Sequence, residues 1–170
     1  MISVNGFRGE YDFLSNFYRS PILYRSISYP NVENAYQAAK FIHLPVEQVT
    51  QLLGPVAMQE YNLDPTDVNI IPHLFAKLKP NIAKKLGKKL PLVDNWDEIK
   101  FDIMRELVFL KFSQNLLLKQ RLLQTQDAIL IETNYWHDNL WGDCMCDRCK
   151  NYKGKNMLGE ILMETREKLK

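Results

Sequence analysis

The chain has 170 residues, 46% of them apolar and 25% charged, with a formal net charge of +2. This length supports one well-buried core but not two comfortable domains, so we expect a single domain over residues 1–170. The small charge does not indicate a broad nucleic-acid surface, and the lack of an apolar run of roughly 18 residues or of a signal-peptide pattern predicts a cytoplasmic protein without membrane contact.

The first half of the chain predicts a hairpin followed by helices. Apolar residues alternate over residues 21–30 and the alternation breaks at Arg25-Ser26, which indicates two short strands joined by a turn. Asn31 stands where it can cap a helix that continues to residue 44, before Pro45. A second short helix is expected over residues 46–53, before Gly54.

The second half is dominated by helical periodicity. A basic helical pattern covers residues 74–90, and the longest periodic stretch, residues 95–125, predicts the central buried helix. Residues 127–132, DAILIE, are typical of a short strand. Asn156 is expected to cap a last amphipathic helix over residues 157–169.

The helix after Asn31 carries three polar side chains on one face. Glu33, Gln37 and Lys40 follow the spacing i, i+4, i+7, so a carboxylate, an amide and an amine point the same way. An ordinary solvated face has the same pattern. A small-molecule site is favoured by the short, alanine-rich sequence and by the tyrosines of the preceding hairpin, which could wall a pocket.

Two segments mix aromatic and polar residues. In YDFLSNFY, Asn16 and Phe17 lie in a stretch too irregular for a strand or helix, where the aromatic rings could stack on a planar base. In NYWHDNLWGD, the residues Trp141, Gly142 and Asp143 follow a predicted strand. A glycine there permits close backbone approach and an aspartate can serve as acid, base or sugar ligand, although a structural turn has the same composition.

The region between residues 144 and 159 offers metal and anion ligands. Cys144, Cys146 and Cys149 could reach one zinc ion, with His137 or Asp147 as the fourth ligand. The second remote cysteine pair of a strong zinc signature is absent, so reduced loop thiols without a metal are the favoured interpretation. Lys155 precedes a helix start and could bind an anion.

Six ordered segments carry a family resemblance: DFLSNF, YPNVENAYQAAKF, MRELVFLKF, LIETN, WGD and GKNMLGEILMETRE. Together they resemble the NADAR family of N-glycosidases across essentially the whole chain. The resemblance implies an intracellular α+β fold, a helix-rich single domain with a small β-sheet, and no cofactor. It also implies hydrolysis of N-glycosidic bonds, with phosphoribosylaminopyrimidine intermediates of riboflavin biosynthesis as one substrate class and ADP-ribosylated guanine of nucleic acid as another.

The resemblance matches residues by motif, and the chemistry of the glycosylamine bond suggests their roles. Glu33 and Asp143 are the expected carboxylate pair for acid-base work, and Lys40 either forms a Schiff base with the opened sugar or binds phosphate. The connector CMCDRCKNYK departs from the glycine-rich link of some relatives. The residues expected to bind substrate are Asn16, Phe17, Gln37, Trp141, Gly142, Lys155, Asn156 and Gly159.

Two other classes stay open at this point. A non-catalytic ADP-ribose reader would keep Trp141 and Asn16 without needing an ionisable pair, and the joint presence of Glu33, Lys40 and Asp143 argues against it. A zinc-dependent interaction module would depend on the three cysteines. The sequence leaves the oligomeric state open.

Overall fold

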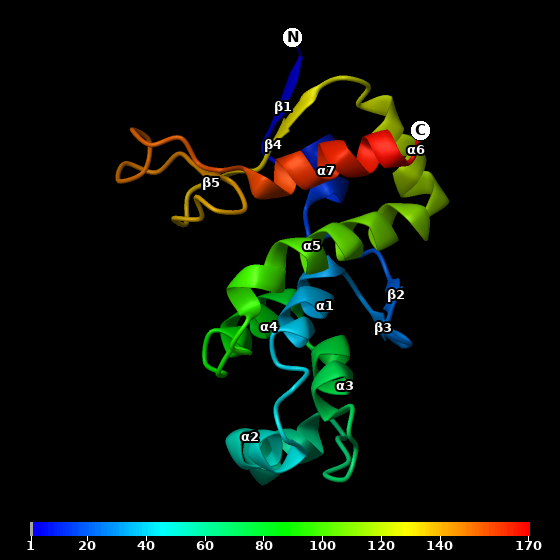
Figure 1. The fold of residues 1–170 in the computed structure, drawn as a ribbon, viewed down its shortest axis with the longest axis vertical. Helices are drawn as coiled ribbons and strands as arrows, with labels where there is room; N and C mark the ends of the chain where they lie inside the picture. The colour runs from blue at the N-terminus through cyan, green and yellow to red at the C-terminus, as the bar shows by residue number, and fades with distance from the viewer. Residues whose placement is uncertain (1) are drawn as a thin grey trace. The chain divides into compact units, whose positions relative to one another are not determined.

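The computed structural model describes residues 2–170. The chain divides into two compact units, a terminal unit and a central unit. The terminal unit joins both ends of the chain, up to Tyr18 and from Val108 onward, and the central unit is Arg19–Leu107. Helices dominate and the strands are short, which confirms the α+β, helix-rich prediction (Figure 1). The expectation of a single domain stays a prediction. No described helix is both long and apolar enough to cross a membrane.

The central unit begins with the predicted hairpin. Strand β2, Ile22–Tyr24, pairs antiparallel with β3, Ile27–Tyr29. The turn places Arg25 at φ 47° and Ser26 at φ 66°, so both residues are left-handed. That is the backbone of a two-residue turn whose twist matches the flanking strands, and here it forms without the usual glycine.

Helix α1, Val32–Ala39, starts as predicted, because the Asn31 side chain accepts a hydrogen bond from the Asn34 amide at 2.9 Å. The prediction that it reaches residue 44 is wrong, since the chain leaves the helix after Ala39 in a series of turns. Every residue of α1 is buried. The helix contacts α3, Ile70–Lys77, and α4, Pro80–Gly87, and it lies beside both in Figure 1.

The helices after α1 are broken more often than their periodicity suggests. Helix α2, Val46–Glu60, is interrupted at Gly54, where φ is 71° and the backbone is not helical, so the predicted end before Gly54 coincides with this kink and a second helical segment follows it. The single helix predicted over residues 74–90 is wrong. Pro80 starts α4 as its first residue and Lys79 before it is extended, because a residue preceding proline disfavours helical backbone.

The long helix predicted over residues 95–125 is also two. Helix α5, Trp96–Ser113, belongs to the central unit up to Leu107 and to the terminal unit beyond it, and α6 is Leu116–Gln124. Between them Asn115 is extended, and its side-chain amide donates to the Lys111 carbonyl at 2.7 Å. This bond satisfies a carbonyl at the end of α5, so the asparagine terminates the helix.

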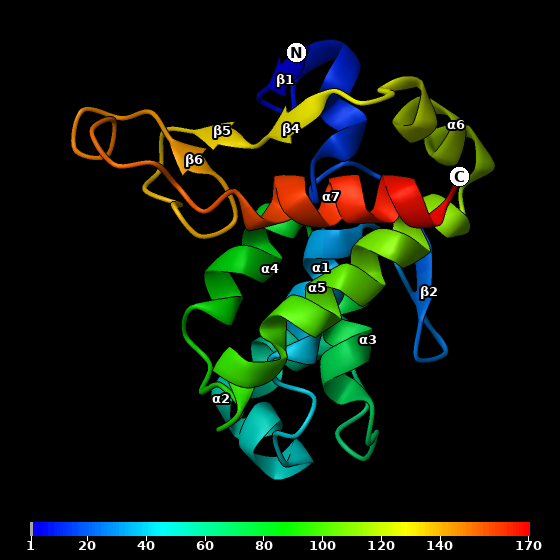
Figure 2. The same cartoon turned by 45° about the horizontal axis from the view of Figure 1, so that its top comes forward.

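The terminal unit packs a helix against a two-stranded parallel sheet. Strand β1, Ser3–Asn5, pairs with β4, Ile129–Ile131, and helix α7, Met157–Lys168, contacts β4 (Figure 2). The strand predicted at residues 127–132 is therefore confirmed. A short 3₁₀ helix, η1, covers Gly9–Leu14, and its Phe13 ring meets that of Phe112 edge to face.

Strand β5, Thr133–Asn134, pairs in parallel with β6, Asp143–Cys144. Asn156 precedes α7 as predicted, but its side chain makes no capping hydrogen bond. Instead its amide nitrogen donates to the Leu130 carbonyl at 2.8 Å and its oxygen accepts from the Glu132 amide at 2.9 Å. The capping prediction is wrong, because both polar atoms of this side chain face β4 and the residue after it.

Candidate active site

The polar row of α1, defined as Glu33, Gln37 and Lys40, lies largely inside the central unit. Glu33 is 6% exposed and Gln37 4% exposed, so the alternative of a solvated face is wrong. The Gln37 amide donates to the Glu33 carboxylate at 2.8 Å, which joins the two side chains one helical turn apart. The structure thus brings these two predicted residues together.

Gln37 retains one unused polar atom. Its Oε1 is buried and has no hydrogen-bond partner among the described residues. A Cβ atom added at Gly87 of α4 would lie 2.0 Å from this oxygen, so glycine is required for the close approach of α4. A buried acceptor without a partner is costly, and a substrate N–H or O–H group would satisfy it.

Lys40, the third member of the row, lies near two aromatic rings. Its Nζ lies 5.1 Å from the centroid of Tyr36 and 5.7 Å from that of Trp96. Burial lowers the pKa of Lys40 to about 8; Glu33 partly offsets this, while Lys84 and Lys88 lower the pKa further. A lysine with this pKa carries a substantial neutral fraction near pH 8 and can act as a nucleophile.

The Trp141–Asp143 segment owes its glycine to backbone packing. A Cβ at Gly142 would lie 2.2 Å from the Glu132 carbonyl oxygen, and a Cβ at Gly154 would lie 2.3 Å from the Gly142 carbonyl oxygen. The carbonyl oxygen of Glu132, between β4 and β5, therefore lies against Gly142. Substrate binding by Gly142 stays a prediction. Asp143 is partly exposed, and its Oδ1 accepts a hydrogen bond from the Gly154 amide at 2.7 Å.

The start of α7 also combines a glycine required by packing with an exposed polar side chain. A Cβ at Gly159 would lie 2.1 Å from the Leu130 carbonyl oxygen, so Gly159 and the bonded Asn156 amide dock α7 on β4. Lys155 is exposed and leaves its ammonium group available for an anion. Substrate binding by Asn156 and Gly159 stays a prediction.

The DFLSNF loop is anchored by a lysine that sequence reasoning missed. Lys111 is 1% exposed, and its Nζ donates to the Ser15 carbonyl at 2.7 Å, next to the predicted site residues Asn16 and Phe17. Burial lowers the pKa of Lys111 to about 7, while Asp12 and Glu132 oppose that shift. Its signal in the sequence is a lysine inside the apolar run LVFLKF. Asn16 is buried and Phe17 is 39% exposed.

The predicted site residues fall into both units. The polar row of α1 belongs to the central unit, and the pairing of Glu33 with Asp143 stays a prediction. The following predicted residues belong to the terminal unit: Asn16, Phe17, Trp141, Gly142, Asp143, Lys155, Asn156 and Gly159.

The structure also gathers possible metal ligands in the terminal unit. Ligand atoms of His137 and the three cysteines Cys144, Cys146 and Cys149 all lie within 4.8 Å of one another. The sequence favoured metal-free thiols and left His137 as one of two further ligand candidates. Its imidazole is the one that the structure brings to the thiols.

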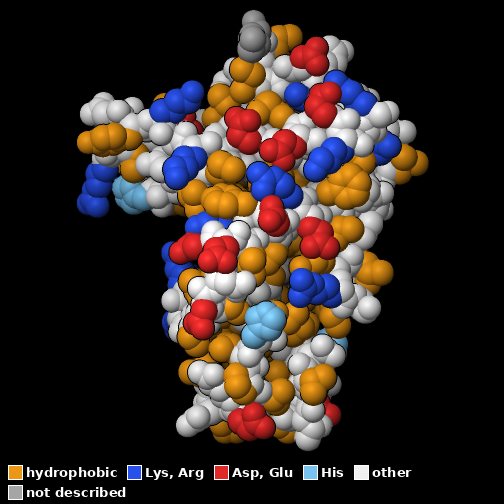
Figure 3. Space-filling model, in the orientation of Figure 1, with side chains coloured by type: hydrophobic (Ala, Val, Ile, Leu, Met, Phe, Trp, Pro, Cys, Tyr) orange, Lys and Arg blue, Asp and Glu red, His pale blue; other side chains and the backbone are white. Residues whose placement is uncertain are grey.

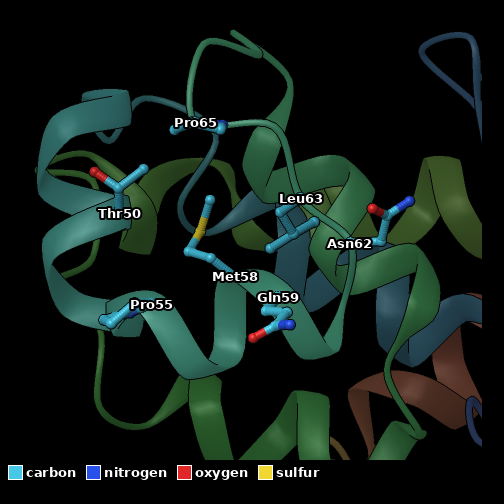
Figure 4. A pocket seen from close by; sticks show the side chains of 8 residues that line it. Thr50, Pro55, Met58, Gln59, Asn62, Leu63 and Pro65 are labelled. Atoms are coloured by element: carbon cyan, nitrogen blue, oxygen red, sulfur yellow. The ribbon is translucent and has the colours of Figure 1, made fainter.

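A separate groove of about 480 Å³ lies along α2 and the loop after it. In Figure 4, Met58 lies between Thr50 and Leu63. None of the residues that line this groove is ionisable, which disfavours acid-base chemistry there. They are Thr50, Gly54, Pro55, Met58, Gln59, Asn62, Leu63 and Pro65.

Surface charge gives little support for a broad nucleic-acid face. Acidic and basic side chains are interspersed on the face drawn in Figure 3, in keeping with the net charge of +2. Any nucleic-acid substrate would then be recognised through local contacts and not by a large positive field.

The chain matches the family model described as NADAR domain over residues 6–170. It is 32% identical over 162 residues to N-glycosidase YbiA of Shigella flexneri, covering 94% of this chain and 82% of that protein. An N-glycosidase of Nostoc punctiforme is also 32% identical, with 94% and 86% covered. A riboflavin biosynthesis protein of Vibrio vulnificus is 30% identical over 160 residues, which cover 94% of this chain and 36% of that longer protein.

A solved structure has the same fold. The NMR structure of the Escherichia coli protein YbiA aligns with a TM-score of 0.69 at 29% identity and covers 99% of this chain and 84% of that one. The helix-rich α+β architecture therefore agrees with an experimental structure of a similar protein.

Proposed function

Because this chain belongs to the NADAR domain family and is an N-glycosidase, we propose that its substrate joins ribose C1 to an exocyclic amine, as in phosphoribosylaminopyrimidine intermediates of riboflavin biosynthesis. The name of the Vibrio relative supports this substrate class. The observation that carries the proposal is the polar row of α1, which combines a buried carboxylate with an amine of lowered pKa.

The chemistry of such a substrate suits this row. A glycosylamine opens to an imine at ribose C1, so the enzyme has to move protons between the ring oxygen, the leaving amine and water. We propose that Glu33 donates the proton that the leaving amine takes up. The free Oε1 of Gln37 would accept a hydrogen bond from a ribose hydroxyl or from the amine itself.

Lys40 has two candidate roles. In the covalent role, its neutral Nζ attacks the opened C1 and the exocyclic amine leaves with a proton from Glu33. Water then hydrolyses the Lys40 imine, which releases the sugar phosphate and restores the amine. In the electrostatic role, Lys40 remains an ammonium group and binds the phosphate. The lowered pKa of Lys40 favours the covalent role.

The residues predicted in the terminal unit keep their roles as separate proposals. Asp143 would activate water or hold the ribose hydroxyls, and the half-exposed Phe17 with Trp141 would stack on the base. Lys155 would bind phosphate through its exposed ammonium group.

Product analysis tests the proposal directly. The purified protein is incubated with a phosphoribosylaminopyrimidine, and the released base and ribose 5-phosphate are identified by chromatography and mass spectrometry. A parallel arm supplies DNA that carries ADP-ribosylated guanine. Release of ADP-ribose in that arm, without turnover of the aminopyrimidine, would replace the proposed substrate by the second class. Tight binding of ADP-ribose without any product would favour a non-catalytic reader.

A matched pair of variants tests the role of Glu33. Glu33→Gln keeps the volume and the helix but removes the proton carrier, so kcat should fall about 100-fold. Glu47→Gln makes the same chemical change at an exposed position in the first turn of α2 and should leave kcat unchanged. Wild-type turnover by Glu33→Gln would refute the assignment.

A further inference from the structure

We propose that the terminal unit binds one zinc ion through the thiol-imidazole cluster, defined as His137, Cys144, Cys146 and Cys149. One ligand atom from each residue lies within 4.8 Å of every other. Three thiolates and one imidazole form a closed tetrahedral donor set, which is typical of structural zinc and leaves no position for substrate. The site is separate from the polar row of α1 in residues and in chemistry.

The distances inside the cluster are close to those between the ligands of one zinc ion. His137 Nδ1 lies 3.2 Å from the Cys146 Sγ and 3.4 Å from the Cys149 Sγ. In a tetrahedron, zinc bound to sulfur at ~2.3 Å and to nitrogen at ~2.0 Å holds the nitrogen and sulfur atoms roughly 3.5 Å apart. A ring nitrogen carries either one proton or one lone pair, so it cannot pair fully with two thiols at once.

The backbone brings His137 to the thiols through a buried asparagine. Asn134 pairs with Cys144 in the β5–β6 ladder. Its side-chain oxygen accepts hydrogen bonds from the Trp136 and Asp138 amides, each at 3.2 Å, and its nitrogen donates to the Asp138 carbonyl at 2.7 Å. These three bonds fold residues 134–138 into a tight loop, so the imidazole is fixed relative to Cys144.

The second half of the cluster is a tight turn. The Cys149 amide donates to the Cys146 carbonyl at 2.9 Å, and the Lys150 amide donates to the same oxygen at 2.8 Å. This turn places the thiols of Cys146 and Cys149 on one side of the backbone. Cys144 is fully buried, Cys146 and Cys149 are partly exposed and His137 is exposed, so the cluster is reachable by an ion from solvent.

The segment around the cluster has few apolar contacts of its own. Between β5 and α7 the described chain contains no helix, and Figure 2 shows the loop after β6 extending beyond the two strands. Tyr135, Trp136, Met145 and Tyr152 are all exposed. Such a loop buries little apolar surface, so a bound zinc ion would supply the free energy that orders it.

The cluster also adjoins a residue of the proposed active site. Cys144 follows Asp143 in β6, and the Gly154 amide that donates to Asp143 lies at the other end of the same loop. Zinc would therefore close the loop that holds the Asp143 carboxylate. Zinc binding does not depend on the proposed substrate, so metal content and stability test it whether or not an N-glycosidase assay succeeds.

Metal analysis of the whole chain tests the site. The protein is purified without a metal-affinity step from cells grown with added zinc, and elemental mass spectrometry should find about one zinc ion per chain. Chelation should lower Tm, and adding zinc should restore it. Cobalt added to the chelated protein should give the intense visible absorption of a tetrahedral thiolate site. Less than about one tenth of a zinc ion per chain, together with no cobalt spectrum, would overturn the proposal.

A matched pair of variants tests the ligand set. His137→Gln should reduce bound zinc several-fold and shift the cobalt spectrum, because one of the four ligands is lost. Asp147→Asn removes a carboxylate from the same turn that lies outside the cluster, and it should keep full zinc content. Loss of zinc in Asp147→Asn with full retention in His137→Gln would overturn the ligand assignment. Chelation of the wild-type protein tests the site without any substitution, which covers the case in which His137→Gln fails to fold.

Discussion

Replacing Lys40 with methionine should change how the stability of the protein depends on pH. Burial lowers the pKa of Lys40 from its ordinary value of 10.5 to about 8. Between these two values the unfolded chain binds more protons than the folded chain, so stability rises with pH. At about 1.4 kcal/mol per pKa unit, protonated Lys40 costs the folded state up to about 3 kcal/mol, and this cost is fully present below pH 8.

The methionine side chain of Lys40→Met cannot be protonated, so this free-energy cost is absent from the variant. The free energy of unfolding of Lys40→Met minus that of the wild type should therefore be about 2 to 3 kcal/mol larger at pH 7 than at pH 10. Altered packing would add the same amount to this difference at both pH values. Urea unfolding at pH 7, 8, 9 and 10 measures the difference. Lys85→Met, at an exposed position on α4, serves as the control and should show a flat difference. A constant difference between Lys40→Met and the wild type over this pH range would refute the reasoning.

Three further outcomes are expected. Borohydride added during turnover should trap substrate on Lys40, and Lys40→Arg should be nearly inactive; an arginine variant that keeps kcat and only raises KM would instead assign phosphate binding to Lys40. Gly159→Ala should lower the free energy of unfolding by about 1 to 3 kcal/mol in urea titrations, because its Cβ would meet the Leu130 carbonyl oxygen, and an unchanged value would contradict the tight docking of α7. Lys111→Met should gain stability relative to the wild type as pH falls from 10 to 7, since burial lowers the pKa of Lys111 to about 7, and urea titrations that show no such gain would refute this.

Local features of this protein were predictable from neighbouring residues. The hairpin at Arg25-Ser26 and the Asn31 cap depend on interactions within four residues, and such interactions are written directly in the sequence. The shared face of Glu33, Gln37 and Lys40 follows from helical geometry alone. The six ordered motifs identified the family, which the family-model match over residues 6–170 confirms.

Helix ends were predicted less well, because periodicity continues through a break. The apolar pattern of residues 74–90 spans the junction before Pro80, and that of residues 95–125 spans Asn115. A proline stands at the first break and an asparagine at the second. Whether such a residue ends a helix depends on whether the freed backbone groups find other hydrogen-bond partners.

Tertiary packing alone determined the contacts of side chains whose partners are distant in the chain. Lys111 donates to a carbonyl 96 residues away and Asn156 to one 26 residues away, so neither partner could be read from local sequence. The burial of Glu33 and Gln37, which separates a site from a solvated face, arises because α3 and α4 pack on α1. The approach of His137 to the cysteines has the same origin, since it requires the β5–β6 pairing and the loop that Asn134 closes. A sequence specifies which chemical groups are present, whereas the free energy of packing distant segments determines which of them meet.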